Sequence, residues 1–266
     1  MKNYKKIITL NKNSRGCYIL DTIKGCSMCS REKPNGCYDN CYANNIAIRY
    51  RYEFSMPVKR DFNRDEEQLY FFGAHDEKHE SQLINKIKGI EMPFVRIGEM
   101  GDPSFDWRHT IDICNIIAIS KKPIVIITKH LNSIPHEILK EIDHLNICIN
   151  TSISALDEEQ QIKQRLQQYL ILKNHCKSVL RIVSCDFNKG CSIGNNNSKI
   201  QDDLFNNENV IDTIFRPNEN NFLVMNRIIN VKKLKFLKAP VLASIFDEKT
   251  YFGDCSHCPD MCGVNL

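Results

Sequence analysis

Two groups of cysteines are the residues in this chain whose spacing could do chemistry. The first group is Cys26, Cys29, Cys37 and Cys41, four thiols within sixteen residues. Glycine and proline between them favour an irregular loop, and a segment of helical composition follows at 42–51. Such a loop can wrap a metal cluster, because thiolates on irregular backbone can converge and a helix N-terminus favours negative charge. The Cys-x2-Cys spacing fits a zinc knuckle equally well.

The second group, Cys255, Cys258 and Cys262, lies close to the other end of the sequence. The six remaining cysteines are scattered, and we expect most of them to be small buried hydrophobic residues: Cys17, Cys114, Cys148, Cys176, Cys185 and Cys191. No apolar leader run is evident, which predicts a cytoplasmic protein. In that compartment clustered cysteines bind metal more often than they form disulfides.

Composition sets broad limits on fold and partners. The chain has 266 residues, of which 42% are hydrophobic, enough for one large domain with a core. A formal net charge of +4 permits a nucleic-acid partner without requiring one. No apolar run approaches the ~18 residues that a membrane span needs, so we expect no membrane partner.

Short apolar strands alternate with helices from residue 93 onward. Strands are expected at 93–97, 123–127, 145–149, 179–183, 211–215 and 241–246. Helices are expected at 42–51, 79–88, 107–119, 135–142 and 157–172, with a long loop over 186–209 that contains a short helix near 199–206. This alternation indicates βαβ units with a parallel sheet.

Polar residues follow successive strands, and such strand ends form the ligand-binding edge of both a (β/α) barrel and an open doubly wound sheet. Because no glycine-rich phosphate loop occurs, we expect the barrel. The predicted fold is therefore α/β, a full or partial TIM-type barrel in a single domain over 1–266, with a cysteine-rich loop near the N-terminus. The cysteine-rich tail at 250–266 is expected to pack on it.

Four segments, in order along the chain, resemble one protein family. Cys29, then Pro-Asn-Gly-Cys at 34–37, then Cys-Tyr-Ala-Asn at 41–44 are similar to its cysteine motif, with slightly longer gaps and Asn44 in place of an acid. The segments at 99–102, 126–129 and 150–154, the last with Gln160 and Arg165 beyond it, are similar to three of its strand ends. Over about residues 25–186 the chain thus resembles the phage-associated radical SAM-like proteins of the radical S-adenosylmethionine superfamily.

The resemblance implies a TIM-type barrel and a [4Fe-4S] cluster held by three thiolates, whose fourth iron binds the amino and carboxylate groups of S-adenosylmethionine. An electron from a reductant such as flavodoxin or ferredoxin then cleaves a C–S bond and gives a 5′-deoxyadenosyl radical. By this resemblance the ligands are Cys29, Cys37 and Cys41, with Cys26 able to replace Cys29. Asn44 stands where the superfamily's usual third cysteine would be.

The resemblance also implies the residues that hold the cofactor. Gly98 and Glu99 correspond to a strand-end pair that binds its amino end. Thr128, Lys129, Asn150 and Ser152 fall where ribose or carboxylate contacts are expected. For Lys129 the alternative is an ordinary salt-bridged strand end.

The C-terminal cysteines admit several interpretations. With Cys26 as a fourth ligand, Cys255, Cys258 and Cys262 would complete a four-thiolate site for an auxiliary iron–sulfur cluster or a zinc ion. Alternatively, the four N-terminal cysteines form a closed site and the C-terminal three form the open one. The tail could also be a segment whose thiols bind metal adventitiously.

The sequence therefore predicts a radical SAM enzyme. Phage association suggests a nucleic acid or nucleotide as substrate, with a peptide or protein still open. A companion three-cysteine-motif protein is a further candidate partner. Two alternatives remain: a non-catalytic nucleic-acid-binding protein with zinc knuckles at both ends, and a barrel that keeps a cluster without radical chemistry.

Overall fold

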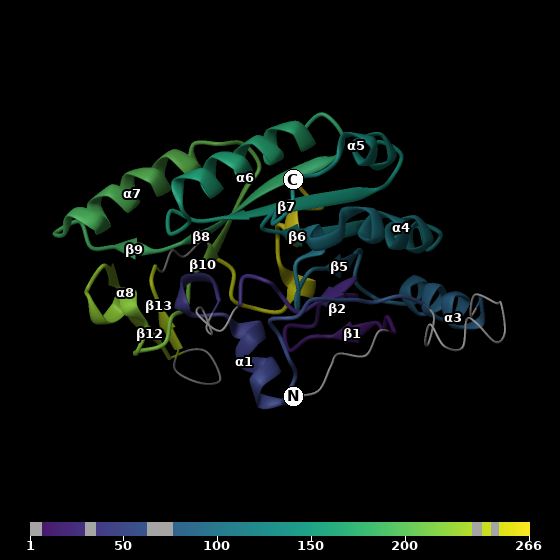
Figure 1. Ribbon diagram of the computed structural model, residues 1–266, viewed down its shortest axis with the longest axis horizontal. Coiled ribbons are helices and arrows are strands. Elements are labelled where there is room, and N and C mark those ends of the chain that lie inside the picture. Colours follow the sequence, from purple (N-terminus) through teal and green to yellow (C-terminus); the bar gives the residue numbers. More distant parts are fainter. Residues whose placement is uncertain (1–6, 30–35, 63–76, 236–240, 246–249) are drawn as a thin grey trace.

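The computed structural model of the chain describes residues 7–29, 36–62, 77–235, 241–245 and 250–266. Within them, a seven-stranded sheet with the order β1-β2-β5-β6-β7-β8-β10 forms the centre (Figure 1). Its strands are β1 (Asn11–Lys12), β2 (Tyr18–Ile19), β5 (Val95–Ile97), β6 (Ile124–Thr128), β7 (Ile147–Ile153), β8 (Lys177–Ser184) and β10 (Val210–Ile214). All neighbours pair in parallel except β1, which is antiparallel to β2.

The prediction of an α/β fold with a mostly parallel sheet is confirmed. In the described part of the chain β1 and β10 each pair with one neighbour only, so the sheet is open between them. The run expected as a strand at 241–246 does not join this sheet. Its described part, β13 (Val241–Ala243), pairs antiparallel with β12 (Lys232–Leu234) instead, and Phe246 lies outside the described residues. Two more short pairs are β3 (Ile23–Lys24) with β4 (Val58–Lys59), and β9 (Asp186–Phe187) with β11 (Ile229–Asn230).

Most predicted helices form within two residues of the expected ends. They are α1 (Tyr42–Arg49), α3 (Glu77–Lys88), α4 (Trp107–Ala118), α5 (His136–Ile142) and α6 (Glu159–Leu172). Figure 1 shows α4 to α7 gathered on one side of the molecule, along the sheet. The described ranges also contain the short helix α8 (Phe222–Met225) and four 3-10 turns: η1 (Cys37–Asp39), η2 (Pro103–Asp106), η3 (Cys255–His257) and η4 (Met261–Gly263).

The prediction of a long loop over 186–209 is wrong, because residues 192–205 form the helix α7 (Ser192–Phe205). Its Asn- and Ser-rich sequence has weak helix propensity, which tertiary contacts override. The Cys191 sulfur caps the helix by accepting the N–H of Gly194. Gln201 is buried and its amide exchanges two hydrogen bonds, of 2.7 and 2.9 Å, with the backbone of Cys185 at the end of β8.

Strand alternation divides the sheet into two faces. Ile153 on β7 and Leu180 and Ile182 on β8 pack with residues of α6 and α7. Arg96, Cys148, Asn150, Val179 and Arg181 therefore point to the opposite face, which we call the inner face. All seven residues of β7 are buried, so this inner face is covered as well. None of the helices in the described ranges is long and apolar enough to cross a membrane.

Gly98 follows β5 with a φ of +95°, and a Cβ there would lie 2.3 Å from the Ile127 carbonyl oxygen. We predict that Gly98→Ala lowers the free energy of unfolding by about 2–4 kcal/mol, because the strained conformation and the backbone clash add. Urea unfolding of the variant would measure this.

Gly89→Ala is the matched control, since a Cβ at that position meets its nearest neighbours at 3.6 and 3.7 Å, an ordinary contact distance. Equal stabilities of the two variants would contradict the assignment of Gly98 to a backbone role.

Candidate functional site

The N-terminal cysteines are positioned by the turn η1 and the start of α1. Cys41 is the N-cap residue of α1, and its sulfur accepts the backbone N–H of Asn44 at 3.5 Å. Cys37 opens η1, and Cys26 is fixed by a 2.7 Å hydrogen bond from its N–H to the Phe54 carbonyl. Gly25, just before Cys26, forms a parallel β-bridge with Gly101. The cysteine loop is thereby joined to the segment that follows β5.

Three of these cysteines, Cys26, Cys37 and Cys41, line a cavity of about 840 Å³. Glu99 and Lys129, which follow β5 and β6, line it as well. Its wall also contains Asp102 and residues at the ends of β8 and β10. The cavity thus lies where the carboxyl ends of parallel strands meet, the usual place for a ligand in α/β proteins.

Cys29 is buried behind this wall and interacts with Cys41. Its thiol donates a hydrogen bond to the Cys41 sulfur. This hydrogen bond lowers the pKa of Cys41 to about 6, although burial opposes the shift. The same hydrogen bond raises the pKa of Cys29. The N–H groups of Asn44 and Ala43 and the charge of Lys129 also lower the pKa of Cys41. Burial raises the pKa of Cys37, with Lys129 opposing, and raises that of Cys26 to about 12.

Within the described residues, no three His, Cys, Asp or Glu side chains are already gathered in a metal-binding arrangement. The donor set nevertheless fits a thiolate-bound metal, because four soft sulfur ligands lie on one loop beside one cavity. Gly36 supports this fit. A Cβ at that position would lie 2.6 Å from the Cys29 sulfur and 2.9 Å from the Cys41 Cβ. The chain therefore carries no side chain at the place where these two cysteines meet.

Of the six residues predicted to hold the cofactor, Glu99 and Lys129 line the cavity. The Glu99 carboxylate accepts the Asn13 amide at 3.3 Å and pairs with Arg96 at 3.0 Å. Its backbone carbonyl accepts the Tyr42 hydroxyl at 2.8 Å. Gly98 adopts a φ of +95° and leaves no room for a side chain beside the Ile127 carbonyl.

The other three predicted residues are not among those that line the cavity. Thr128 is buried and donates its hydroxyl to Asp102 at 2.7 Å. Asn150 donates its amide to the Cys262 carbonyl at 2.9 Å, and its oxygen accepts from Arg181. Ser152 is buried within β7. Their contacts with a cofactor stay predictions.

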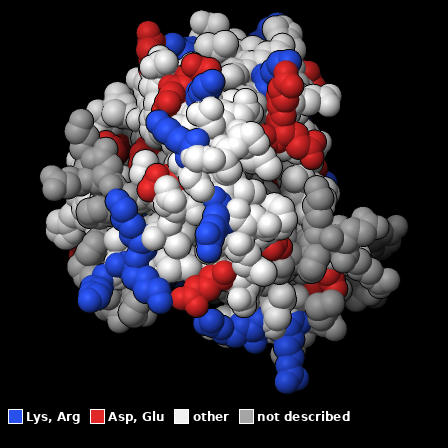
Figure 2. Space-filling view, turned by 90° about the vertical axis from the view of Figure 1, so that its left-hand side faces the viewer, with Lys and Arg blue, Asp and Glu red and all other residues white. Residues whose placement is uncertain are grey.

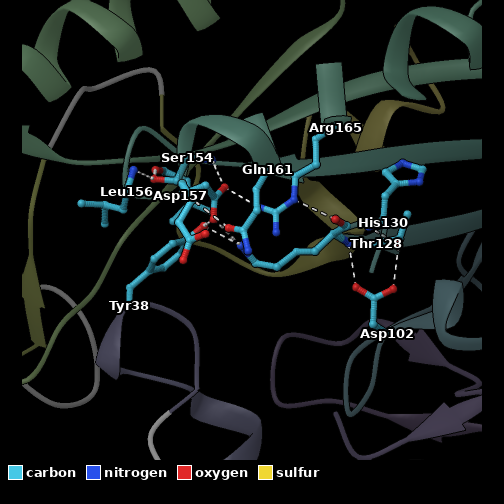
Figure 3. A network of polar contacts seen from close by, with 12 residues as sticks. Tyr38, Asp102, Thr128, His130, Ser154, Leu156, Asp157, Gln161 and Arg165 are labelled. Carbon is cyan, nitrogen blue, oxygen red and sulfur yellow. Dashed lines mark hydrogen bonds and ion pairs between the residues drawn. The ribbon is translucent and has the colours of Figure 1, made fainter. Parts of the chain in front are cut away.

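Sequence reasoning missed Asp157, whose carboxylate joins Tyr38 and Lys129 of the cavity wall in one polar network. Its carboxylate accepts the Tyr38 hydroxyl at 2.6 Å and the Ser154 N–H at 2.8 Å, and it is paired with Arg165 (Figure 3). Lys129 donates to the Tyr38 hydroxyl and lies 3.5 Å from Asp157. The one available signal was Arg165 on α6, eight residues beyond Asp157, which lies just before the helix.

Charge explains why this network can be buried. Although burial opposes it, the positive charges of Lys129 and Arg165 hold the pKa of the Asp157 carboxyl below its usual value. Burial and the neighbouring Asp157 raise the pKa of Tyr38, so that its hydroxyl remains a donor. Arg165 also donates to the Lys129 carbonyl at 2.7 Å. The network therefore joins η1, the end of β6 and the start of α6 around the cysteine loop.

Asp102 organises the neighbouring strand end. It accepts hydrogen bonds from the Ser104 backbone and hydroxyl, from Thr128, and from the Lys129 N–H at 2.7 Å. Figure 3 shows it below Thr128 and His130. The backbone position of Lys129 is thus set by Asp102, and its ammonium group is directed to Tyr38 and Asp157.

The C-terminal cysteines lie in a different place. Cys255, Cys258 and Cys262 line a second cavity, of about 110 Å³, together with Arg15, Arg96, Arg181 and Arg216. Cys26, predicted as their fourth ligand, instead lines the first cavity with Cys37 and Cys41. The structure therefore keeps all four N-terminal cysteines together.

The chain was compared with known proteins. A scan against protein-family models and a search of curated proteins found no match. The resemblance inferred from the motifs therefore stays a prediction.

We predict that Asp157→Asn lowers the free energy of unfolding by about 3 kcal/mol, because it removes the negative partner of two buried or half-buried cations. Tyr38→Phe, which removes one hydroxyl from the same network, should cost about 1 kcal/mol. Denaturant unfolding would measure both. Glu159→Gln, which breaks only the exposed Lys163–Glu159 pair, is the control and should leave stability unchanged. A neutral effect of Asp157→Asn would contradict the role assigned to the network.

His130 predicts a pH dependence of stability. It is buried against Trp107, with ring centroids 5.7 Å apart, and burial lowers its pKa to about 4. The unfolded chain takes up this proton near pH 6.5, so the stabilisation is present above that pH and is lost as the pH falls toward 4. The slope is up to about 1.4 kcal/mol per pH unit.

Unfolding curves at several pH values would measure this slope. His130→Asn suits the backbone, because asparagine tolerates the positive φ of 50° at this position. The variant should be less stable at pH 7 and less sensitive to acid between pH 6.5 and 5. Parallel curves for the two proteins would exclude His130 as the source.

Proposed function

We propose that this chain is a radical S-adenosylmethionine enzyme on a partial (β/α) barrel, with a [4Fe-4S] cluster held by Cys29, Cys37 and Cys41. One observation carries the proposal: thiols of the N-terminal loop line a large cavity at the carboxyl ends of the parallel strands, beside Glu99 and Lys129. Cys26 lines the same cavity and is the alternative to the more deeply buried Cys29. When bound, the cluster supplies the electron that cleaves a C–S bond of S-adenosylmethionine.

The residues around the cavity suit such a cofactor. Lys129 places a positive charge near Cys37 and Cys41 and so favours their thiolate forms. The Glu99 carboxylate, oriented by Arg96 and Asn13, can accept the amino group of an amino acid. Apolar side chains such as Phe54, Ile214 and Phe215 form other parts of the wall and limit the water that would quench a reactive intermediate.

The size and charge of the cavity bear on the substrate. About 840 Å³ is near the upper end of the range of about 300–1,000 Å³ for small-molecule sites, which leaves room for a substrate beside a cofactor. Arg216 and Asn218 at the cavity offer donors for a phosphate, consistent with a nucleotide, whereas Lys233 beside them is paired with Glu219 at 3.1 Å. On the side of the molecule in Figure 2, basic and acidic side chains are interspersed. This favours a small substrate over a long nucleic acid bound along that side, which a continuous basic surface would serve better.

The test is anaerobic purification with iron and sulfide analysis, followed by electron paramagnetic resonance of the reduced protein. We expect at least about four irons per chain, a signal that changes when S-adenosylmethionine is added, and formation of 5′-deoxyadenosine with dithionite, flavodoxin or ferredoxin as reductant. Cys37→Ala should lose the signal and the product.

Cys114→Ala is the matched control, because Cys114 is a fully buried thiol in α4, away from both cavities. A protein that holds zinc and no iron would refute the proposal and favour a nucleic-acid-binding zinc protein. Iron without 5′-deoxyadenosine would favour a barrel that keeps a cluster but no radical chemistry.

A further inference from the structure

Cys17, expected from the sequence to be a core residue, lies against the C-terminal cysteines. It precedes β2 and is fully buried. Its thiol lies within hydrogen-bonding reach of the Cys255 sulfur and 3.8 Å from the Tyr18 carbonyl oxygen. The backbone brings the two residues together, because the Cys255 N–H donates to the Arg15 carbonyl at 2.7 Å. A thiol from the start of the sheet thus meets one from the tail, more than two hundred residues later.

The other two tail cysteines are held by consecutive turns. The Cys258 N–H donates to the Cys255 carbonyl at 3.3 Å, and the Met261 N–H donates to the Cys258 carbonyl at 3.2 Å. The Cys258 sulfur accepts backbone N–H groups of Asp260 and Met261. Cys262 itself adopts a φ of 55°, unusual for a residue with a side chain. The N–H···S contacts to Cys258 stabilise its thiolate form, which is the form that binds a metal.

The charge around these thiols is positive. Four guanidinium groups line the small cavity beside Cys255, Cys258 and Cys262, against the two carboxylates of Asp212 and Asp260. Even with Arg96 paired to Glu99, the lining keeps excess positive charge. A zinc ion or a [4Fe-4S]²⁺ cluster bound by four thiolates carries a net charge of about −2. The arginines would offset that charge, whereas four neutral thiols would leave them in excess.

We propose that Cys17, Cys255, Cys258 and Cys262 hold a thiophilic metal, either a zinc ion or an iron–sulfur cluster, at a site that uses none of the cysteines of the first cavity. These four thiols are not yet gathered in a metal-binding arrangement, so binding would draw them closer together. Binding would release the thiol protons and replace the Cys17–Cys255 contact with metal–sulfur bonds. This differs from the sequence-based grouping, in which Cys26 was the fourth ligand. It does not depend on the radical chemistry proposed above.

The C-terminal tail lies where a bound metal would stabilise the fold. At one side Arg15 donates to the Gly253 carbonyl at 3.0 and 3.1 Å. At the other side Asn150 on β7 and Lys177 on β8 donate to the carbonyls of Cys262 and Val264. The tail therefore runs from the β2 side of the sheet to β7 and β8. A metal at the four cysteines would fasten it there and add its binding free energy to folding.

The experiment uses the full chain with Cys29, Cys37 and Cys41 all changed to alanine, so that any remaining metal reports on the second site. Purified anaerobically with zinc and with iron plus sulfide in separate preparations, it should retain either one zinc or one cluster per chain. Adding Cys17→Ser or Cys258→Ser should abolish this metal and lower the unfolding temperature. Adding Cys26→Ser or Cys114→Ser should change neither.

A second measurement on the unaltered chain covers the case in which these variants do not fold. Iodoacetamide labelling, read by mass spectrometry, should leave Cys17, Cys255, Cys258 and Cys262 protected until a chelator is added, and then label the partly exposed Cys258 and Cys262 together. Labelling of Cys258 and Cys262 that is unaffected by chelator would overturn the proposal. So would loss of the metal with Cys26→Ser but not with Cys17→Ser, or a Cys17–Cys255 disulfide in the anaerobic protein.

Discussion

The arrangement of the first cavity depends on the ion pairs and hydrogen bonds that the Asp157 carboxylate forms. The Asp157 side chain is buried, and it accepts hydrogen bonds from the Tyr38 hydroxyl on the cysteine loop and from the backbone of Ser154 while pairing with Arg165 and Lys129. A buried charge is tolerated only when it is paired and hydrogen-bonded. This requirement holds η1 against the strand ends, and with it the cysteines on either side of Tyr38. Tyr38 itself adopts a φ of 55°, a conformation that the surrounding contacts must enforce.

An ion pair between Arg96 and Glu99 links the two cysteine sites, and Thr213, Ile214 and Arg216 line both cavities. Arg96 points from β5 to the inner face and lines the small cavity, whereas its partner Glu99, three residues later, lines the large one. Tyr42, on the helix that Cys41 caps, donates to the Glu99 carbonyl. The positive charge of Arg96 at the small cavity is thus neutralised by Glu99 at the large cavity, and the reverse. A metal at either site would act on this pair, because charges in a low-dielectric interior are poorly screened.

The strands and helices could be predicted because their signals are local. The apolar runs that became β6 and β8 and the amphipathic spacing of α4 carry that information in a few consecutive residues. Helix α7 could not be predicted this way, since Gln201 and the Cys191 cap stabilise it through contacts that its weak composition does not reveal. Asp157 and Cys17 were missed for a related reason. Each was one polar or thiol residue among many, and only the fold brings Tyr38 to the first and Cys255 to the second.

Asn150 is a polar strand residue that binds the C-terminal tail. A polar side chain near the end of a barrel strand normally indicates ligand binding, which led to its prediction as a cofactor contact. In this fold the chain from 253 to 264 lies on the inner face, and the Asn150 amide donates a hydrogen bond to the backbone carbonyl of Cys262. Gly263 fits so closely that a Cβ would lie 2.4 Å from Val179 and 3.1 Å from the Cys148 sulfur. The tail covers part of the inner face of the open sheet, so β10 and β1 need not pair to bury that part. The same packing explains why the tail's cysteines meet Cys17, which lies at the start of the sheet, and not the loop that carries Cys26.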